Sequence, residues 1–256
     1  MTQGVSGPQT WTPGEERRPR DAAARAAGLF LLLTALATVL MVALRVAADA
    51  DQSTLAESLA AVSESRAVYG IGGAARMVSG VTLAAAAWFL LNTWIIRERF
   101  GSPIVPILFA VSGLFTLVSG ACAVWLAVSV PGTTGAIDAF AASSSTEVAD
   151  YLRWLTGKIG FAIAGLALLA AARYQWRAGG MLRVIAPVSV VIGISMQFIW
   201  IDSAMFMHRV SGNAFLLWII VIGAMLATGR IERRFSSMKD PPSGYDAHTT
   251  PRGNAD

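Results

Sequence analysis

Four ionisable side chains that could do chemistry fall within or at the edge of apolar segments of the sequence. They are Arg76, Lys158, Asp202 and His208. A charge inside a bilayer costs roughly 2.5–3.5 kcal/mol on insertion scales, so such residues usually face the interior of a helix bundle and pair there. Two cations would suit an anionic group, and the imidazole would add a pH-sensitive donor. This pattern predicts a polar ligand-binding pocket.

A second interpretation of the same residues needs no ligand. Asp202 could neutralise either Arg76 or Lys158, and the remaining cation could extend its charged end to the membrane surface. Two cations against one acid leave a surplus of positive charge unless Asp150 or Glu64 also reaches the cluster. Both interpretations remain open from the residues alone.

Metal binding is a weak alternative at the same place. Met205, Met207 and His208 form an M-x-M-H run, and thioethers with an imidazole suit Cu(I). Methionine also fills gaps between packed helices, which is its commoner role. Haem held by two histidines across the bundle is excluded because the second histidine, His248, lies in the polar C-terminal stretch; ligation of haem or chlorophyll by one histidine stays open. We predict no metal and no cofactor.

Catalysis has little support in the sequence. Ser211, His208 and Asp202 have the residue types of a hydrolase triad, but the sequence holds no nucleophile elbow, HExxH motif or glycine-rich phosphate loop. The glycines in 70–73 follow no strand pattern and suit close helix contact instead. We expect a protein that is not an enzyme.

The composition decides the class of protein that must position these side chains. Hydrophobic residues make up 55% and charged residues 14% of the chain, whereas soluble domains carry about a quarter charged residues. Several nearly uncharged runs reach the roughly 20 residues that a helix needs to cross a bilayer. The net charge of +4 does not indicate nucleic-acid binding, because the basic residues gather at the ends of apolar segments.

The apolar runs predict an all-α, polytopic membrane protein with six transmembrane helices in one domain, 22–230. Residues 1–21 and 231–256 are predicted to be disordered cytoplasmic tails. The first apolar run exceeds a signal-peptide core, although the alanines in 47–50 leave cleavage as an alternative. The predicted helices span about 22–45, 68–96, 103–130, 151–173, 182–201 and 211–229.

Lysine and arginine predict the orientation. Fourteen of these residues fall on the side that holds both termini, five fall on the other side, and Arg76 lies inside a helix. By the positive-inside rule both termini are cytoplasmic. The fourteen are Arg17, Arg18, Arg20, Arg25, Arg97, Arg99, Arg173, Arg177, Arg183, Arg230, Arg233, Arg234, Lys239 and Arg252, and the five are Arg45, Arg66, Arg153, Lys158 and Arg209.

Two long connections, about 49–66 and 131–150, are predicted on the outside. Thr54 and Glu57 have capping-box spacing, which predicts a short surface helix in the first. A shift of 82 residues pairs Tyr69 with Tyr151 and Arg76 with Lys158, consistent with a diverged hairpin repeat or with chance.

Helical periodicity predicts which faces turn inward. One stripe holds Gly72, Arg76 and Ser79, and a second runs from Trp154 through Lys158 and Phe161 to Gly165. Ser112-Gly113 and Ser119-Gly120 form a small-residue face that would admit a close neighbouring helix.

Three stretches resemble small bacterial six-helix membrane proteins in families known only as domains of unknown function. They are ARAAGLFLLLTAL near the first helix, LRWLTGKIGF, and FIWIDSAMFMHRVSGNAFLLWIIVIGAML. The resemblance covers most of 22–230, implies a multi-pass protein of a bacterial inner membrane, and implies no activity and no site residues.

Two functions follow as hypotheses. The first is a non-enzymatic accessory or structural protein of the bilayer, with a protein partner or a second copy packed on its small-residue helix faces. The alternative is a small transporter or sensor that binds an anionic ligand in an outward-facing pocket at Arg76, Lys158, Asp202 and His208.

Overall fold

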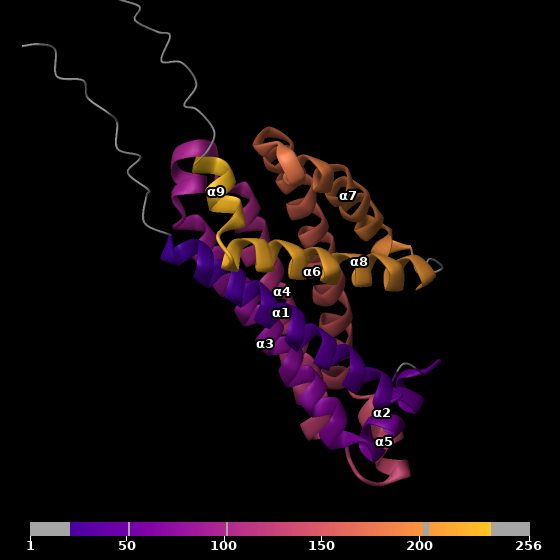
Figure 1. Ribbon diagram of the computed structural model, residues 1–256. Coiled ribbons are helices and arrows are strands. Elements are labelled where there is room, and N and C mark those ends of the chain that lie inside the picture. The colour runs from indigo at the N-terminus through magenta and orange to yellow at the C-terminus, as the bar shows by residue number, and fades with distance from the viewer. Residues whose placement is uncertain (1–20, 51, 101, 202–204, 237–256) are drawn as a thin grey trace, which may run out of the picture.

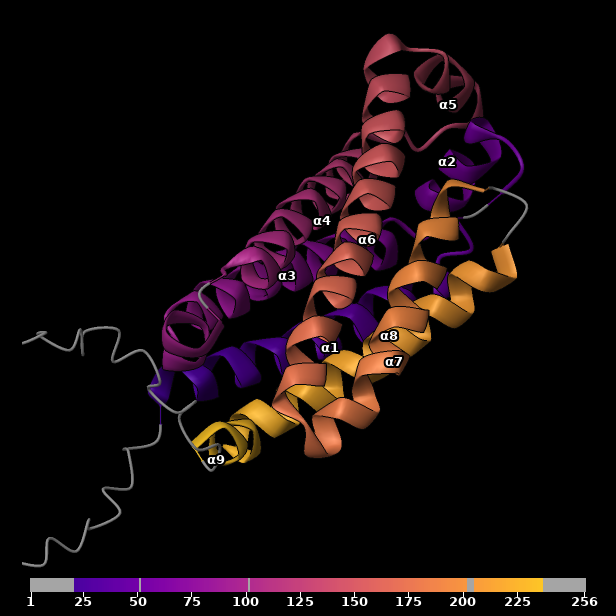
Figure 2. The same cartoon turned by 90° about the horizontal axis from the view of Figure 1, so that it is seen from above.

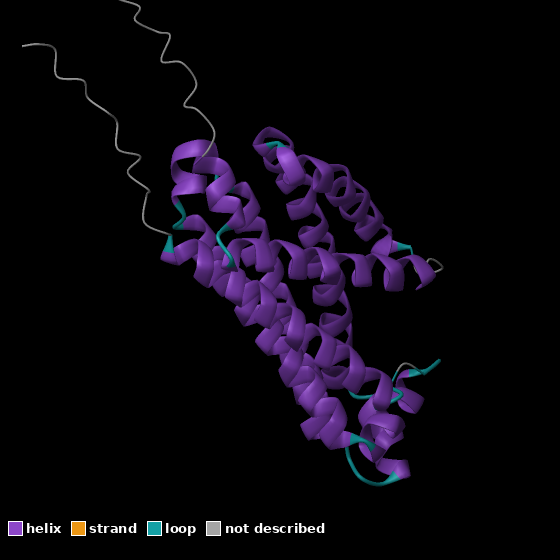
Figure 3. Ribbon diagram, viewed as in Figure 1, coloured by secondary structure: helices purple, strands orange, loops and turns teal. Residues whose placement is uncertain are grey.

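The computed structural model describes residues 21–50, 52–100, 102–201 and 205–236, and every element in those ranges is a helix (Figures 1 and 3). Six helices are long and apolar enough to cross a membrane, which confirms the predicted six-span, all-α architecture. They are α1 (Ala22–Ala47), α3 (Arg66–Leu91), α4 (Ile104–Ser129), α6 (Ser144–Ala178), α7 (Gly180–Met196) with the 3-10 turn η2 (Gln197–Trp200), and α8 (Met205–Ala227).

The six spanning helices pack in a closed order. α1 packs on α3, α3 on α4, α4 on α6, α6 on α7, α7 on α8, and α8 returns to α1. In Figure 2 the α7–α8 hairpin lies on the opposite side of α6 from the α3–α4 pair. Because the ring closes, each helix has two helical neighbours, and only its outer face is left for lipid.

Short helices mark the two ends of the bundle. α2 (Leu55–Glu64) and α5 (Thr134–Ala141) lie together at one end, called here the α2–α5 end. The π-helix η1 (Ile95–Phe100), α9 (Arg230–Ser236) and the start of α1 lie at the other, called the α9 end. Asp21 ties the α9 end together, since one carboxylate oxygen accepts the N–H of Ala23 and the other the N–H of Trp94.

Glycine allows the closest helix contacts. A Cβ at Gly80 of α3 would lie 2.5 Å from the carbonyl oxygen of Gly113, and one at Gly113 would lie 2.6 Å from that of Gly80. The two backbones therefore touch, as small-residue motifs permit in membranes. Hydroxyl pairs join α3 to α1 on its other side, Thr34 to Thr82 at 2.9 Å and Thr38 to Ser79 at 2.8 Å.

The ends of several helices differ from the predicted ones. α3 ends at Leu91 rather than about 96, because the side chains of Asn92 and Thr93 bond carbonyls of its last turn. The predicted surface helix is α2, and its capping box is present. The second predicted connection is mostly helix, since it holds α5 and the first seven residues of α6.

The polar turn predicted before the last span is largely helical as well. Met207, His208 and Arg209 belong to α8 rather than to a loop. At the other end of α8, residues 231–236 belong to α9, although the sequence predicts a polar tail from 231. Ile231 and Phe235 are buried there and belong to the apolar core of the bundle. Residues 1–20 of the predicted N-terminal tail and the rest of the C-terminal one lie outside the described residues, whereas Asp21, the last residue of that predicted tail, is the N-cap of α1.

Candidate functional site

Arg76 lies where α1, α3, α4 and α6 meet. It is ten residues into α3, about 15 Å along the helix from the α2–α5 end. Its guanidinium rests against the backbone of α6 at Gly157, where an added Cβ would come within 2.5 Å of Nη2. The missing side chain at Gly157 is therefore what gives the guanidinium its place.

Arg45 of α1 and Arg153 of α6 line a small cavity together with Arg76. The cavity has a volume of about 20 Å³, which is room for roughly one water molecule. Its other walls are formed by Met41, Tyr69, Gly72, Gly73 and Ala123. Three arginines from three different helices therefore line one small space, called here the arginine cavity.

The three arginines differ in their partners. Arg153 donates from Nε and Nη2 to the Asp150 carboxylate, at 3.0 and 2.7 Å. The backbone of Arg153 is also fixed, because its carbonyl accepts the Ser119 hydroxyl at 2.5 Å. Arg76, in contrast, forms no hydrogen bond and no ion pair with any residue in the described ranges. A half-buried guanidinium is thus left with unused donors.

Tyr69 adds a second unused donor. Its side chain is 7% exposed and lines the arginine cavity, and its hydroxyl has no hydrogen-bond partner within the part of the chain that the structure describes. α2 and α5 cover this end of the bundle, since Leu59 and Val62 of α2 and Ile137 of α5 belong to the same apolar cluster as Tyr69. The cavity can therefore offer donors from Arg76 and Tyr69 to a single acceptor.

Lys158 occupies a different environment from Arg76. It is 8% exposed, its ammonium lies 3.9 Å from the centre of the Trp154 ring, and it has further interactions. Lys158 does not line the arginine cavity. The next residue on its stripe, Phe161, packs edge-on against Phe215 of α8, so this face of α6 turns toward α8.

His208 joins two elements rather than lining the arginine cavity. Its Nε2 lies 2.8 Å from the carbonyl oxygen of Phe198 in η2. A carbonyl can only accept, so Nε2 must carry the proton.

The remaining predicted site residues receive no support as a group. Asp202 lies outside the described residues, and so does the side chain of Met205. Met207 is exposed, and no three His, Cys, Asp or Glu side chains gather at one point within the described ranges. The Ser211 hydroxyl donates to the carbonyl of Met207 at 2.7 Å. Copper binding at Met205, Met207 and His208 remains the weak alternative to the prediction of no metal.

Sequence reasoning missed Arg45 and Arg153 as neighbours of Arg76. The sequence indicates only that both are basic residues at the outer ends of helices, because hydropathy predicts depth but not which helices are adjacent. One signal was available: Arg153 follows Asp150 by three residues, a spacing that pairs side chains on a helix.

Comparisons with known proteins give no relative from which a site could be transferred. No family model, no curated protein and no solved structure matches this chain. The resemblance to six-helix bacterial families remains a prediction, and function must be inferred from the geometry.

Proposed function

We propose that this protein binds an anionic group, a phosphate or a carboxylate, in the arginine cavity. In this proposal it is a non-enzymatic transporter or sensor of a bacterial inner membrane, with both termini cytoplasmic. The arginine cavity then lies in the outer half of the membrane under α2 and α5, because the excess of lysine and arginine marks the α9 end as the inner one.

The observation that carries the proposal is the absence of a counter-charge for Arg76 among the described residues. Burying an unpaired cation is costly, and two more arginines nearby raise that cost by like-charge repulsion. A structural role would pair the guanidinium with a carboxylate, as Asp150 pairs with Arg153. An anionic ligand would satisfy Arg76 in the same manner.

The donor chemistry suits an oxyanion. A guanidinium presents parallel N–H groups that match two oxygens of a phosphate or carboxylate, and the Tyr69 hydroxyl can serve another oxygen. The cavity of about 20 Å³ holds one or two oxygens rather than a whole molecule. The rest of the ligand would extend toward α2 and α5. A lipid headgroup and a free anion share this chemistry.

The alternative of an accessory protein has less support from the fold. It depends on small-residue faces open to a partner, but the best of these is filled within the chain. Gly113 packs against α3, and Ser112 and Ser119 of α4 donate to carbonyls of α6 at Gly160 and Arg153. A partner would need another surface.

The test compares the thermal stability of three forms in nanodiscs of zwitterionic lipid: the natural chain, Arg76→Gln and Arg209→Gln. Inorganic phosphate should stabilise the natural chain by about 2.7 kcal/mol at one hundred times its Kd, against chloride of equal ionic strength. Arg76→Gln should lose this response. Arg209 is an exposed cation of α8, so Arg209→Gln should keep it.

The stability of Arg76→Gln without phosphate separates the two functions. The proposal expects it to equal or exceed that of the natural chain, because a partly buried, unpaired charge is removed. A clear loss of stability, with no response to phosphate in any form, would instead assign Arg76 a structural role. If anionic lipid in the disc stabilises the natural chain but not Arg76→Gln, and phosphate stabilises neither, the ligand is a lipid headgroup.

A further inference from the structure

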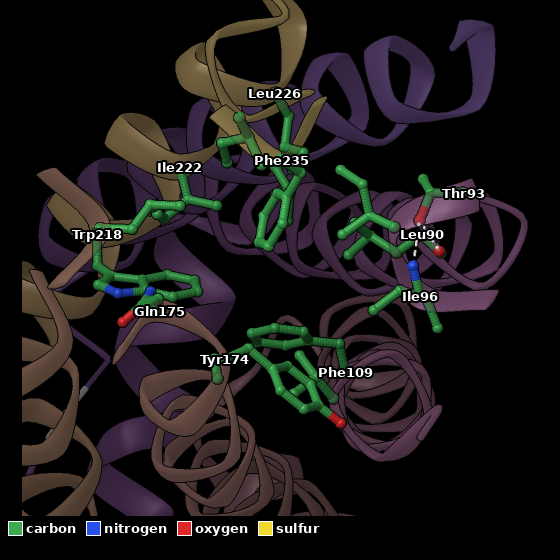
Figure 4. A pocket seen from close by; sticks show the side chains of 16 residues that line it. Leu90, Thr93, Ile96, Phe109, Tyr174, Gln175, Trp218, Ile222, Leu226 and Phe235 are labelled. Carbon is green, nitrogen blue, oxygen red and sulfur yellow. Dashed lines mark hydrogen bonds between the residues drawn. The ribbon is translucent and has the colours of Figure 1, made fainter. Parts of the chain in front are cut away.

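A second cavity lies at the α9 end and is almost entirely apolar. Its volume is about 110 Å³, and each of the six spanning helices contributes to its wall. Ile231 and Phe235 of α9 also line it, and Figure 4 shows the Phe235 ring. For comparison, an engineered apolar cavity of about 150 Å³ in another protein stays dry and binds benzene. The cavity is thus close to the size of one six-membered ring.

Aromatic side chains make up much of the wall. Phe109 and Tyr174 lie on one side, Phe235 lies opposite them, and Trp218 forms one end (Figure 4). Phe109 and Trp218 are in contact, with ring centres 6.1 Å apart. Flat, rigid walls of this kind favour a flat ring over a flexible chain, because offset and edge-on ring contacts add to the burial of area.

One polar side chain of this wall has an unused hydrogen-bonding atom. Gln175 lines the cavity beside Trp218 and is 6% exposed. Its Oε1 accepts the Ser189 hydroxyl at 2.7 Å, and that hydroxyl oxygen accepts Trp218 Nε1–H at 2.7 Å. Nε2 of Gln175 has no partner within the described residues. If the amide is turned over, Ser189 can donate to the Ile185 carbonyl at 3.1 Å, and Oε1 becomes the unused atom.

Water does not suit this position. A buried water needs two to four polar partners, and the other polar groups of the wall are already engaged. The Thr93 hydroxyl donates to the backbone carbonyl of Leu90, and the Tyr174 hydroxyl donates to that of Ser102 at 2.9 Å. The amide of Gln175 therefore offers one hydrogen bond in an apolar enclosure.

We propose that this cavity binds a membrane-soluble ring compound that carries one hydroxyl or carbonyl oxygen, with that oxygen on the Gln175 amide. The ring fills the space between Phe109, Tyr174, Trp218 and Phe235. α9 covers the bound ring. Its Arg234 lies against the α6–α7 turn at Gly180, where an added Cβ would meet the guanidinium at 3.0 Å. This site is independent of the arginine cavity at the opposite end of the bundle.

The test uses two probes of matched shape, 4-bromophenol and 4-bromotoluene, with the full chain in nanodiscs. Bromine quenches tryptophan fluorescence on contact. The quenching at Trp218 is obtained as the difference between the natural chain and Trp218→Phe. This part should saturate with both probes. It should saturate at a concentration on the order of three- to tenfold lower for bromophenol, since one hydrogen bond distinguishes the two.

Two variants make the test specific. Gln175→Leu keeps the volume but removes the hydrogen bond, so it should bind both probes equally. Ala171→Leu should fill the cavity and abolish saturable quenching by either probe, while phosphate still stabilises the protein. The proposal is overturned by equal binding of the probes to the natural chain, by a preference that persists in Gln175→Leu, or by quenching at Trp218 that never saturates.

Discussion

The two cavities handle buried polar groups in opposite ways. At the α2–α5 end three arginines surround a space for about one water molecule, and Arg76 has no counter-charge in the described ranges. In the cavity at the α9 end the polar groups of the wall are neutral, and Ser189 links Gln175 to Trp218. The first cavity holds a guanidinium without a counter-charge. In the second, nearly every polar group has a hydrogen-bond partner. The uncompensated charge of Arg76 is the basis for the proposed anionic ligand, and the apolar enclosure is the basis for the proposed ring compound.

Helix α6 lines both cavities. Substitutions at two of its glycines distinguish a contact with another backbone from a contact with a side chain that can move. Gly165→Leu should give the largest effect, a loss of about 3 kcal/mol in the free energy of unfolding. The new Cβ would lie 2.9 Å from the Gly193 carbonyl oxygen of α7, and a backbone cannot yield as a side chain can. Denaturant unfolding in mixed micelles measures the loss. Gly157→Ala is the matched control, because its Cβ meets the movable end of Arg76, and a loss equal to that of Gly165→Leu contradicts the distinction.

Breaking the neutral network should cost more than removing the charge of Arg76. Ser189→Ala leaves Trp218 Nε1 and Gln175 Oε1 unpaired at once, so we expect a loss of about 2–3 kcal/mol. Ser195→Ala provides the control on the same helix, because the Ser195 hydroxyl bonds only the Ile192 carbonyl of its own helix. The same unfolding assay applies to both. If the two serine variants unfold alike, the network contributes nothing.

Lys158 and Arg76 should respond differently to loss of charge. Lys158→Met removes the contact with Trp154 and should cost about 1–2 kcal/mol, while the stabilisation by phosphate persists. Arg76→Gln should keep its stability and lose the stabilisation by phosphate. Thermal unfolding with and without phosphate measures both quantities. If Lys158→Met alone abolished the phosphate response, the ligand would have to lie on the α8 side of α6.

The smallest effect concerns the cover over the arginine cavity. Thr54→Ala removes the N-cap of α2 and should loosen this helix by about 1 kcal/mol, which amide exchange detects locally. Hydrogen bonds from Ser53 and Thr54 hold the pKa of Glu57 below its usual value. This contribution is therefore complete above the ordinary carboxyl pKa and disappears as pH falls through the lowered one. Acid should therefore raise amide exchange in α2, and exchange in α2 that does not change between neutral and acid pH would contradict this.

The sequence predicts depth better than lateral neighbours. Apolar length located all six spans because a helix must bury its backbone in hydrocarbon whichever helices surround it. Polar residues predict loops at 144–150 and 205–210, yet both segments are helical. A helix forms its own backbone hydrogen bonds in water as well as in lipid. The depth of Arg76 was apparent from the sequence. That Arg45 and Arg153 are its neighbours depends on which helices touch. Gln175 stands between Tyr174 and Trp176 in the sequence, and nothing in that pattern indicates that its amide lines a cavity.

The most direct measurement of the central claim is equilibrium binding of labelled inorganic phosphate to the protein in zwitterionic nanodiscs. We predict saturable binding of one phosphate per chain, lost in Arg76→Gln, weakened in Tyr69→Phe and retained in Arg209→Gln. Binding that does not saturate, or that Arg76→Gln retains in full, would contradict the assignment of the arginine cavity as an anion site.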